Sequence, residues 1–311
     1  MPVDLQTVLT AYQLDTLIKS TPIIGGTLHK SFHAITEKGE YVIKQLNQDL
    51  EQFQYWETTE AIARAAKEKG FQARTAFLLN QKTLFKIGTE VYAVYPYLKK
   101  QSITLTEKHI TQIAQTSAQL HQLKLQLEKA PAFPAFMIQA DEWQEHAGEF
   151  ASLLKNRIPQ FLDIQAHYQQ AFERLKQHTL ISHRDFTPAN LLWQDDASFT
   201  VIDWELAGFI NPELEMLSNA IDVAIMNNTI KARHVFYYLN AYKTKIRTLI
   251  ENPMDLIYGC LGSWVFWILF CLKRHNHTFK PIDTEKMIRK TYSVIDFLLE
   301  NAKNIELALL T

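Results

Sequence analysis

The sequence predicts an α+β fold of two lobes, in which an antiparallel sheet lobe precedes a larger, mainly helical lobe. At 311 residues the chain is longer than one small core requires. Strand-like runs are concentrated before Leu98, and helical periodicity dominates after it. We therefore expect an N-terminal lobe at residues 1–98, a C-terminal lobe at residues 99–311 and a cleft between them.

The first elements are a short helix and a hairpin. Residues 3–19 have a helical pattern that Thr21-Pro22 breaks. Residues 30–46 contain two runs of β-branched and aromatic residues, separated by a turn at Lys38-Gly39. We expect two antiparallel strands there.

Alternation in the second strand places Val42, Lys44 and Leu46 on one face of the sheet. Residues 49–69 follow without glycine or proline and are rich in Glu, Ala and Lys, which favours a helix that ends at Gly70. This helix would pack on the sheet.

Three more strands are expected before the lobe boundary. TAFLLN at 75–80 and TLFKIG at 83–88 flank a polar turn at Gln81-Lys82, and EVYAVYPYL follows at 90–98. Together with the hairpin they predict an antiparallel sheet that carries one helix.

The C-terminal lobe has a different pattern. Five residues from 110 to 123 recur at helical spacing, namely Ile110, Ile113, Ser117, Leu120 and Leu123. Short apolar runs interrupt the helices as TLISH at 179–183, NLLW at 190–193 and FTVIDW at 199–204. We expect three short strands there, with helices to the end of the chain.

Composition and charge exclude several classes of function. The net charge is −1, so no basic footprint for nucleic acid or an anionic membrane is present. Cys260 and Cys271 are the two cysteines, and both lie in an apolar segment, which argues against a disulfide framework or a zinc site. Residues 257–272 are too short for a typical membrane span and predict a buried helix. We expect a cytoplasmic protein without a signal peptide.

Residues 181–208 contain the pattern that indicates chemistry. Asp185 lies in a loop between strands, Asn190 follows five residues later, and Asp203 ends an apolar strand. Phosphoryl transfer needs a positioned hydroxyl and neutralised phosphate charge, and Mg²⁺ prefers oxygen ligands. The pattern therefore predicts that Asn190 and Asp203 bind Mg²⁺ while Asp185 accepts the hydrogen bond of an attacking hydroxyl.

HRDFTPAN at 183–190 and VIDWE at 201–205 resemble the catalytic loop and metal-binding aspartate of the kinase superfamily. Because the chain is short and rich in helix, it is more similar to the aminoglycoside phosphotransferase and choline kinase family. This resemblance implies a bilobal, protein-kinase-like fold, with ATP and Mg²⁺ between the lobes and a small-molecule hydroxyl as the phosphate acceptor. It also implies that Asp185 is the catalytic residue.

The resemblance extends to the nucleotide site. Lys44 resembles the strand lysine that pairs with the nucleotide phosphates, and its helix partner would be Glu60 rather than Glu57. The other nucleotide contacts implied by the resemblance are Val42, above the adenine, and the hinge residues Tyr95, Tyr97 and Leu98. The match to a glycine-rich phosphate loop is weak, because Gly25-Gly26-Thr27 lacks the GxGxxG spacing.

The acceptor is less well defined. Glu205 follows the metal aspartate as in choline kinases and is a candidate for a second metal or for the substrate. Asp222, Trp264 and Trp267 are candidates for binding a cationic group, although such residues equally suit a helix start or a core. Choline, ethanolamine, thiamine or an aminoglycoside would fit this pattern.

Two alternatives remain. A protein kinase needs a long segment after the metal aspartate, but Pro212-Glu213 comes only nine residues after Asp203. A pseudokinase that binds nucleotide without transferring phosphate would ordinarily lack Lys44, Asp185, Asn190 or Asp203. All four are present. His183 and His121 are expected to support the loop structurally, and Arg184 has no assigned role.

Overall fold

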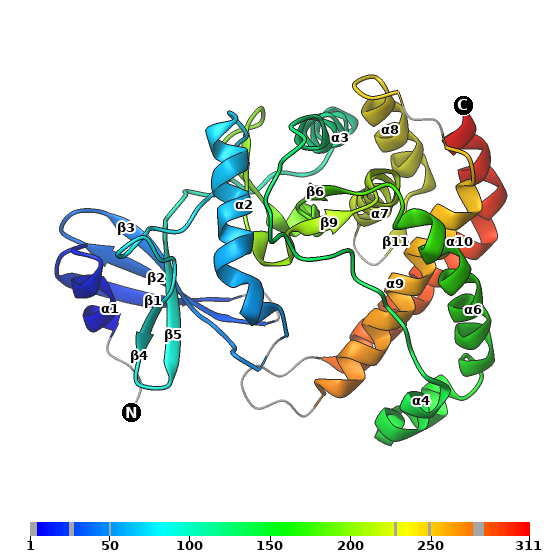
Figure 1. The fold of residues 1–311 in the computed structure, drawn as a ribbon, viewed down its shortest axis with the longest axis horizontal. Coiled ribbons are helices and arrows are strands. Elements are labelled where there is room, and N and C mark those ends of the chain that lie inside the picture. The colour runs from blue at the N-terminus through cyan, green and yellow to red at the C-terminus, as the bar shows by residue number, and fades with distance from the viewer. Residues whose placement is uncertain (1–4, 25–27, 50, 227–228, 248–249, 276–282) are drawn as a thin grey trace.

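The computed structural model describes residues 5–24, 28–49, 51–226, 229–247, 250–275 and 283–311. It confirms the α+β prediction. Figure 1 shows an antiparallel sheet at one end of the molecule and a helical part at the other, with both chain termini on the outside.

The sheet contains the N-terminal strands in the order β1-β2-β3-β5-β4, and every neighbouring pair is antiparallel. Its strands are β1 (Leu17–Ile23), β2 (Lys30–Thr36), β3 (Glu40–Gln45), β4 (Phe85–Ile87) and β5 (Glu90–Pro96). The hairpin expected at residues 30–46 is confirmed as β2 and β3. Lys44 pairs with Ser31 on one side and with Ala93 on the other, so it lies in the central strand.

The two faces of β3 enter different clusters, as alternation requires. Ile43 packs toward α1 (Leu5–Ala11). Val42 and Leu46 pack on the opposite face in a cluster that includes Trp56. Lys44 shares the face of Val42, which is the face toward the helical part.

Two predictions for the N-terminal region are wrong. The helix expected at 3–19 ends at Ala11, and β1 occupies the later residues. Pro22 is compatible with β1 because this strand is at the edge of the sheet, where a missing N–H costs no ladder bond. TAFLLN at 75–80 forms no regular strand: the Phe77 N–H donates to the Val94 carbonyl of β5 at 2.8 Å, whereas the Ala76 N–H donates to the Glu60 carboxylate of α2 at 3.1 Å.

The helix predicted at residues 49–69 is present as α2 (Trp56–Glu68), preceded by the 3-10 turn η1 (Glu51–Tyr55). Gly70 follows with φ of 85°, in the left-handed region that glycine adopts without strain. Figure 1 shows α2 between the sheet and the helical part, so it packs where the two meet.

The rest of the chain is mainly helical. Its helices are α3 (Glu107–Gln122), α4 (Ala140–Ala147), α5 (Ala151–Leu154), α6 (Ile158–Leu175), α7 (Pro212–Ala224), α8 (Ala232–Lys243), α9 (Pro253–Lys273) and α10 (Thr284–Leu310), with short 3-10 turns η2 (Gly148–Phe150), η3 (Pro188–Asn190) and η4 (Trp204–Leu206). One large apolar cluster joins these helices and forms the main core.

Short strands support the loops at the centre of the helical part. They are β6 (Leu180–Ser182), β7 (Leu191–Trp193), β8 (Phe199–Val201), β9 (Gly208–Ile210), β10 (Ile225–Met226) and β11 (Thr229–Ile230). The first three were expected. The strand β9 was not, although it pairs with β6. A Cβ atom at Gly208 would lie 2.6 Å from both Arg184 Nη1 and the Pro131 carbonyl oxygen, so the close approach there requires glycine.

Within the described residues, α9 is the one helix that is long and apolar enough to cross a membrane. Its most apolar stretch is 67% buried inside the protein. It packs against α6, α7 and α10. The helix therefore matches the buried helix expected at residues 257–272, and both cysteines in it are buried with free thiols.

Candidate active site

The loop between β6 and β7 carries the residue expected to be catalytic. Asn190 Nδ2 donates to the carboxylate of Asp185 at 2.7 Å and to its backbone carbonyl at 2.9 Å. These two bonds fix the side chain of Asp185 against its own loop. They also commit the Asn190 amide nitrogen, so its amide oxygen is the atom that remains for a cation.

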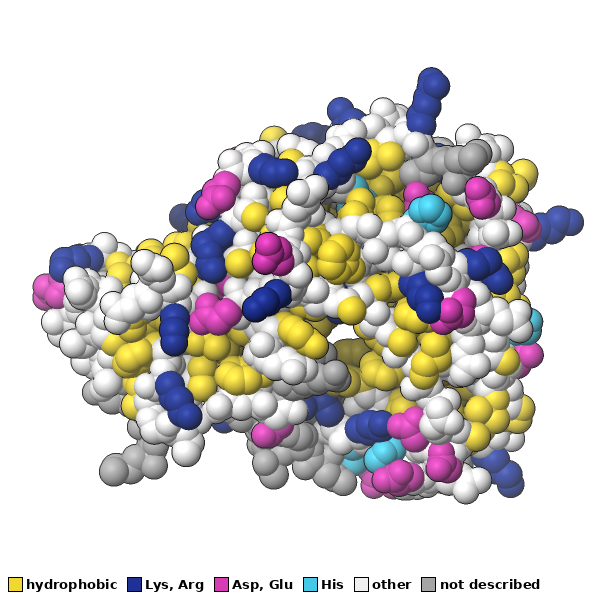
Figure 2. Space-filling view, in the orientation of Figure 1, with side chains coloured by type: hydrophobic (Ala, Val, Ile, Leu, Met, Phe, Trp, Pro, Cys, Tyr) yellow, Lys and Arg dark blue, Asp and Glu magenta, His cyan; other side chains and the backbone are white. Residues whose placement is uncertain are grey.

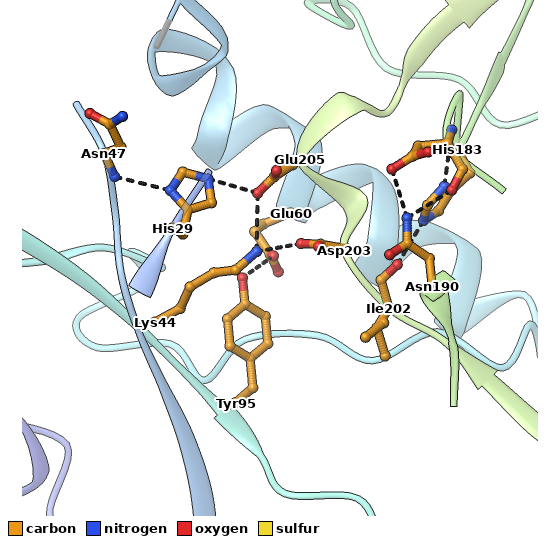
Figure 3. Close-up of polar contacts among 11 residues, drawn as sticks. His29, Lys44, Asn47, Glu60, Tyr95, His183, Asn190, Ile202, Asp203 and Glu205 are labelled. Carbon is orange, nitrogen blue, oxygen red and sulfur yellow. Dashed lines mark hydrogen bonds and ion pairs between the residues drawn. The ribbon is translucent and has the colours of Figure 1, made fainter. Parts of the chain in front are cut away.

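His183 supports this loop from below and is fully buried. Its Nε2 donates to the carbonyl oxygen of Ile202 at 2.9 Å, and its Nδ1 accepts from the Asp185 N–H at 3.3 Å (Figure 3). Burial lowers the pKa of the imidazole, which keeps the ring neutral and suited to donate once and accept once. The structural role expected for His183 agrees with these contacts.

A second buried pair holds the loop from α3 and α7. His121 Nε2 lies 2.6 Å from one oxygen of Glu215, and the other oxygen accepts from the backbone N–H of Arg184 at 2.6 Å. Arg184 has φ of 65°, a left-handed conformation that is uncommon for a residue with a side chain. The Glu215 carboxylate therefore stabilises a strained turn one residue before Asp185.

Asp203 lies across the cleft from Lys44. It also has a left-handed backbone, with φ of 66°, at the point where β8 gives way to η4. Its Oδ1 bonds the Nζ atom of Lys44, which comes from β3 in the sheet. The contact joins two residues that the sequence separates by 159 positions. Figure 2 shows the surface hollowed between the sheet side and the helical side, with hydrophobic side chains around the hollow.

Glu205 completes the contacts of Lys44. Its Oε2 lies 3.0 Å from Lys44 Nζ and 2.9 Å from His29 Nε2, as Figure 3 shows. His29 in turn accepts from the Asn47 backbone N–H at 3.0 Å through Nδ1. His29 was not anticipated from the sequence, since a lone histidine after a glycine pair carries no distinctive spacing. The described contacts of the Glu205 carboxylate are therefore with Lys44 and His29.

The expected ion pair between Lys44 and Glu60 is not formed. Glu60 accepts from the Tyr95 hydroxyl at 2.7 Å and from the Ala76 N–H at 3.1 Å. Burial raises the pKa of the Glu60 carboxyl, and these bonds only partly offset the effect. Glu57 is occupied as well, by the N–H groups of Thr83 and Leu84. The acids of α2 therefore bind the sheet and its connections.

The hinge residues have separate positions. The Tyr97 N–H donates to the Glu40 carbonyl at 3.1 Å and its ring stacks on His33, whereas Leu98 is half-buried just beyond the strand. Val42 is buried beside Tyr95. The phosphate loop considered at Gly25-Gly26-Thr27 lies outside the described residues.

Negative charge is concentrated around the Asp185 carboxylate. Burial raises the pKa of Asp185 well above its usual range, and the charges of Asp222 and Asp203 raise it further. Burial also raises the pKa of Asp222 to about 7, while Lys290 acts in the opposite direction. A carboxyl with a raised pKa is a better base, which suits Asp185 for accepting a proton.

The two tryptophans expected near the acceptor lie on α9. Trp264 is half-buried and packs against the main core. Trp267 is half-buried and stacks on Phe270, with ring centroids 5.1 Å apart. Both rings are thus partly covered by neighbouring apolar side chains.

The oxygen atoms available at the cleft fit a hard divalent cation. Asp203 contributes a carboxylate and Asn190 an amide oxygen, and Mg²⁺ is commonly held by one or two such ligands together with substrate phosphates. Within the described residues no group of three or more His, Cys, Asp or Glu side chains forms a metal cage.

Comparison with known proteins gives a family. The model of the phosphotransferase enzyme family matches residues 19–221, while no curated protein matches the sequence. The chain has the fold of a spectinomycin phosphotransferase solved with ADP and spectinomycin (15% identity, 96% of this chain and 98% of that one, TM-score 0.71). It is similarly related to a microcompartment-associated aminopropanol kinase (13%, 98% and 100%, TM-score 0.68) and to a choline kinase from Streptococcus pneumoniae (15%, 95% and 98%, TM-score 0.68). The matched segment begins within β1, ends within α7 and includes Lys44, Asp185, Asn190, Asp203 and Glu205, so the chain belongs to the phosphotransferase enzyme family.

Proposed function

We propose that the chain is a small-molecule kinase that transfers the γ-phosphate of ATP to a hydroxyl group in a reaction that depends on Mg²⁺. The observation that carries this proposal is the meeting of Lys44 with Asp203 across the cleft, beside an Asp185 carboxylate fixed by Asn190. This arrangement supplies a cation for phosphates, oxygen ligands for a metal and a base for a hydroxyl.

Each residue has a role in the proposed reaction. Asp185 orients the acceptor hydroxyl and takes its proton as the oxygen attacks the phosphorus in line. Lys44 holds the nucleotide phosphates. Asn190 and Asp203 would hold Mg²⁺, which supplies positive charge to the phosphate oxygens. Electrostatic positioning of this kind accounts for most catalysis of phosphoryl transfer.

The nucleotide base would bind between the two parts of the protein. We keep the division at Leu98, with lobes at residues 1–98 and 99–311, as part of the proposal. Val42 would cover the adenine. Because the Tyr97 N–H already donates to the Glu40 carbonyl of β3, Leu98 is the hinge residue we favour for the hydrogen bond to the adenine edge.

The acceptor is a small molecule in this proposal, not a protein. The helix α7 begins at Pro212, and the short strand β9 occupies most of the segment after η4. A protein kinase uses a long segment at this point to form its peptide platform. The short chain segment between Asp203 and Pro212 therefore favours a small-molecule acceptor over a peptide.

A cationic acceptor, such as an amino alcohol or an aminoglycoside, suits the charges near Asp185. Asp222 is close enough to raise the pKa of Asp185 and offers a negative charge to an amine. The half-buried ring of Trp267 would add a cation–π contact. Proteins with this fold include a spectinomycin phosphotransferase, an aminopropanol kinase and a choline kinase, which supports the same class of acceptor.

The proposed location of the protein is the cytoplasm. The free thiols of Cys260 and Cys271 suit the reducing conditions there.

ATP consumption with Mg²⁺, measured over a panel of amino alcohols, sugars and aminoglycosides, tests the proposal. We expect turnover with one of the cationic alcohols and little with neutral sugars. Binding of ADP without ATP consumption across the whole panel would support the pseudokinase alternative instead. Phosphorylation of protein substrates alone would contradict the compact acceptor.

A further inference from the structure

The two acids that contact Lys44 both come from the helical part of the protein. Lys44 is 8% exposed, and its Nζ atom lies between Asp203 and Glu205, two residues of the segment that follows β8. Because a buried ammonium group is costly unless it is paired, these carboxylates determine where the Lys44 side chain is directed.

Glu205 is better placed than Asp203 to be the lasting partner. In the proposed reaction the Asp203 carboxylate is needed by the metal, which repels Lys44. Glu205 has no competing task, and its second contact is His29 at 2.9 Å.

The surrounding residues fix this geometry from the sheet side. The ring of His29 packs edge-on against Trp56 with centroids 5.3 Å apart, and Lys44 Nζ lies 5.3 Å from the same Trp56 ring. The first residue of α2 therefore supports both partners of Glu205 with an aromatic face. The acid of α2 that could compete, Glu60, is occupied by the hydroxyl of Tyr95.

We propose that Glu205, held in place by His29, is the residue that positions Lys44 for the nucleotide phosphates, in place of an acid from α2. This inference rests on the proposed ATP-dependent function. Glu205 is then neither a metal ligand nor an acceptor contact. When the metal engages Asp203, the bond to Glu205 keeps the lysine extended toward the phosphates instead of allowing it to follow Asp203.

Metal-free nucleotide binding separates this role from the others. ADP binding in EDTA, measured by titration calorimetry, reports Lys44 without any metal. For Glu205→Gln we expect binding to weaken about 10-fold to 100-fold, the effect of losing one charge-assisted bond. Lys44→Met should show a similar loss, and the double variant should bind no more weakly than Lys44→Met, because Glu205 acts through Lys44.

A distant acid and His29 provide the controls. Glu149→Gln is the matched control, since Glu149 also pairs with a histidine, His275 at 2.8 Å, but at an exposed position in the helical part. It should bind ADP like the wild type. His29→Asn should weaken binding in the wild-type background and have no further effect when combined with Glu205→Gln.

Three results would overturn the inference. Wild-type ADP binding in EDTA by Glu205→Gln, with loss of only Mg²⁺-dependent turnover, would identify Glu205 as a metal ligand. A change confined to the acceptor KM would identify it as a substrate contact. Coupling of Glu60→Gln to Lys44→Met would show that the α2 acid, and not Glu205, positions Lys44.

If Glu205→Gln does not fold, Glu205→Asp is the second variant. We expect an intermediate loss of ADP affinity for it, and unchanged affinity would count against the role. A wild-type protein that binds no nucleotide would instead refute the proposed function itself.

Discussion

His121 and Glu215 form a buried pair, 2.6 Å apart, that joins α3 to α7 beneath the catalytic loop. The pair extends in both directions. The Tyr242 hydroxyl from α8 lies 2.6 Å from the other ring nitrogen of His121, and the Arg184 N–H bonds the other oxygen of Glu215. Three helices and the loop are thus connected through two side chains.

Replacing His121 with alanine should destabilise the protein by about 3–5 kcal/mol, because it leaves the Glu215 charge buried without its partner. Urea unfolding measures the loss. Glu285→Gln is the control, since Glu285 pairs with Arg289 on the exposed side of α10 and should cost under about 1 kcal/mol. Equal losses for the two variants would contradict the importance of the buried pair.

The same pair predicts a pH dependence of stability. Although burial acts in the opposite direction, the bonds and charge of His121 lower the pKa of Glu215 below its ordinary value of 4.5. A carboxyl with a lowered pKa contributes stability above its unfolded pKa and loses it as the pH falls through the folded value. His121→Ala should therefore flatten the acid side of the stability curve, measured by thermal unfolding between about pH 3 and pH 6.

Asp185→Asn should abolish most turnover while leaving the nucleotide site intact. The amide keeps the shape of the side chain but cannot take a proton, and loss of a general base typically costs about 100-fold to 10,000-fold in rate. The readouts are kcat for the acceptor found in the screen and ADP affinity by calorimetry. Full activity in this variant would refute the catalytic assignment, and a large loss of ADP affinity would show a wider structural effect.

Binding of a cationic acceptor should improve as the pH rises through about 7, the raised pKa of Asp222. Below that pH the carboxyl is protonated and offers no charge to an amine. The groups that act on it include Lys290 from α10 and Asp185 from the catalytic loop. We expect the acceptor KM to fall across pH 6 to 8 in the wild type, and to stay flat over this step in Asp222→Asn.

A pH-dependent KM in Asp222→Asn equal to that of the wild type would assign the titration to another group.

The effect of Asp222 ionisation on folding stability has the opposite sign to its effect on acceptor binding. Because the folded pKa lies above the ordinary value of 3.8, the unfolded chain releases this proton first, so ionisation of Asp222 destabilises the fold as the pH rises toward about 7.

Gly262→Ala should destabilise the contact between α6 and α9. A Cβ atom at Gly262 would lie 2.4 Å from Cδ2 of Tyr168, a ring that is 1% exposed and has no room to shift. Overpacking of this kind costs about 1–3 kcal/mol, against a gain of about 1 kcal/mol in helix propensity. Ser263→Ala is the neighbouring control, because the Ser263 hydroxyl bonds only the Cys260 carbonyl of its own helix. Urea unfolding in which Gly262→Ala is as stable as the wild type would contradict the close packing.

Local patterns in the sequence were sufficient for the hairpin β2–β3 and for the helix α2, since each has a clear periodicity and a clear end. They failed at β1 and at TAFLLN. In the first case a proline looked like a helix break, although an edge strand tolerates it. In the second, the Phe77 N–H bonds β5 while the Ala76 N–H bonds Glu60 of α2, so the segment lies against β5 without forming a regular strand. Both errors come from partners that are distant in sequence.

The sequence by itself determined which residues could do the chemistry, because Asp185, Asn190 and Asp203 occur at a spacing within one short stretch that the kinase pattern also has. It determined the face of β3 that carries Lys44 as well. Only the tertiary structure decided which acid meets that lysine. Glu60 has the expected position along the chain, yet Tyr95 and Ala76 engage it, whereas Glu205 reaches Lys44 from 161 residues away. Periodicity fixes the direction of a side chain relative to its own strand or helix, but its partner from a distant part of the chain depends on how the sheet and the helical part pack together.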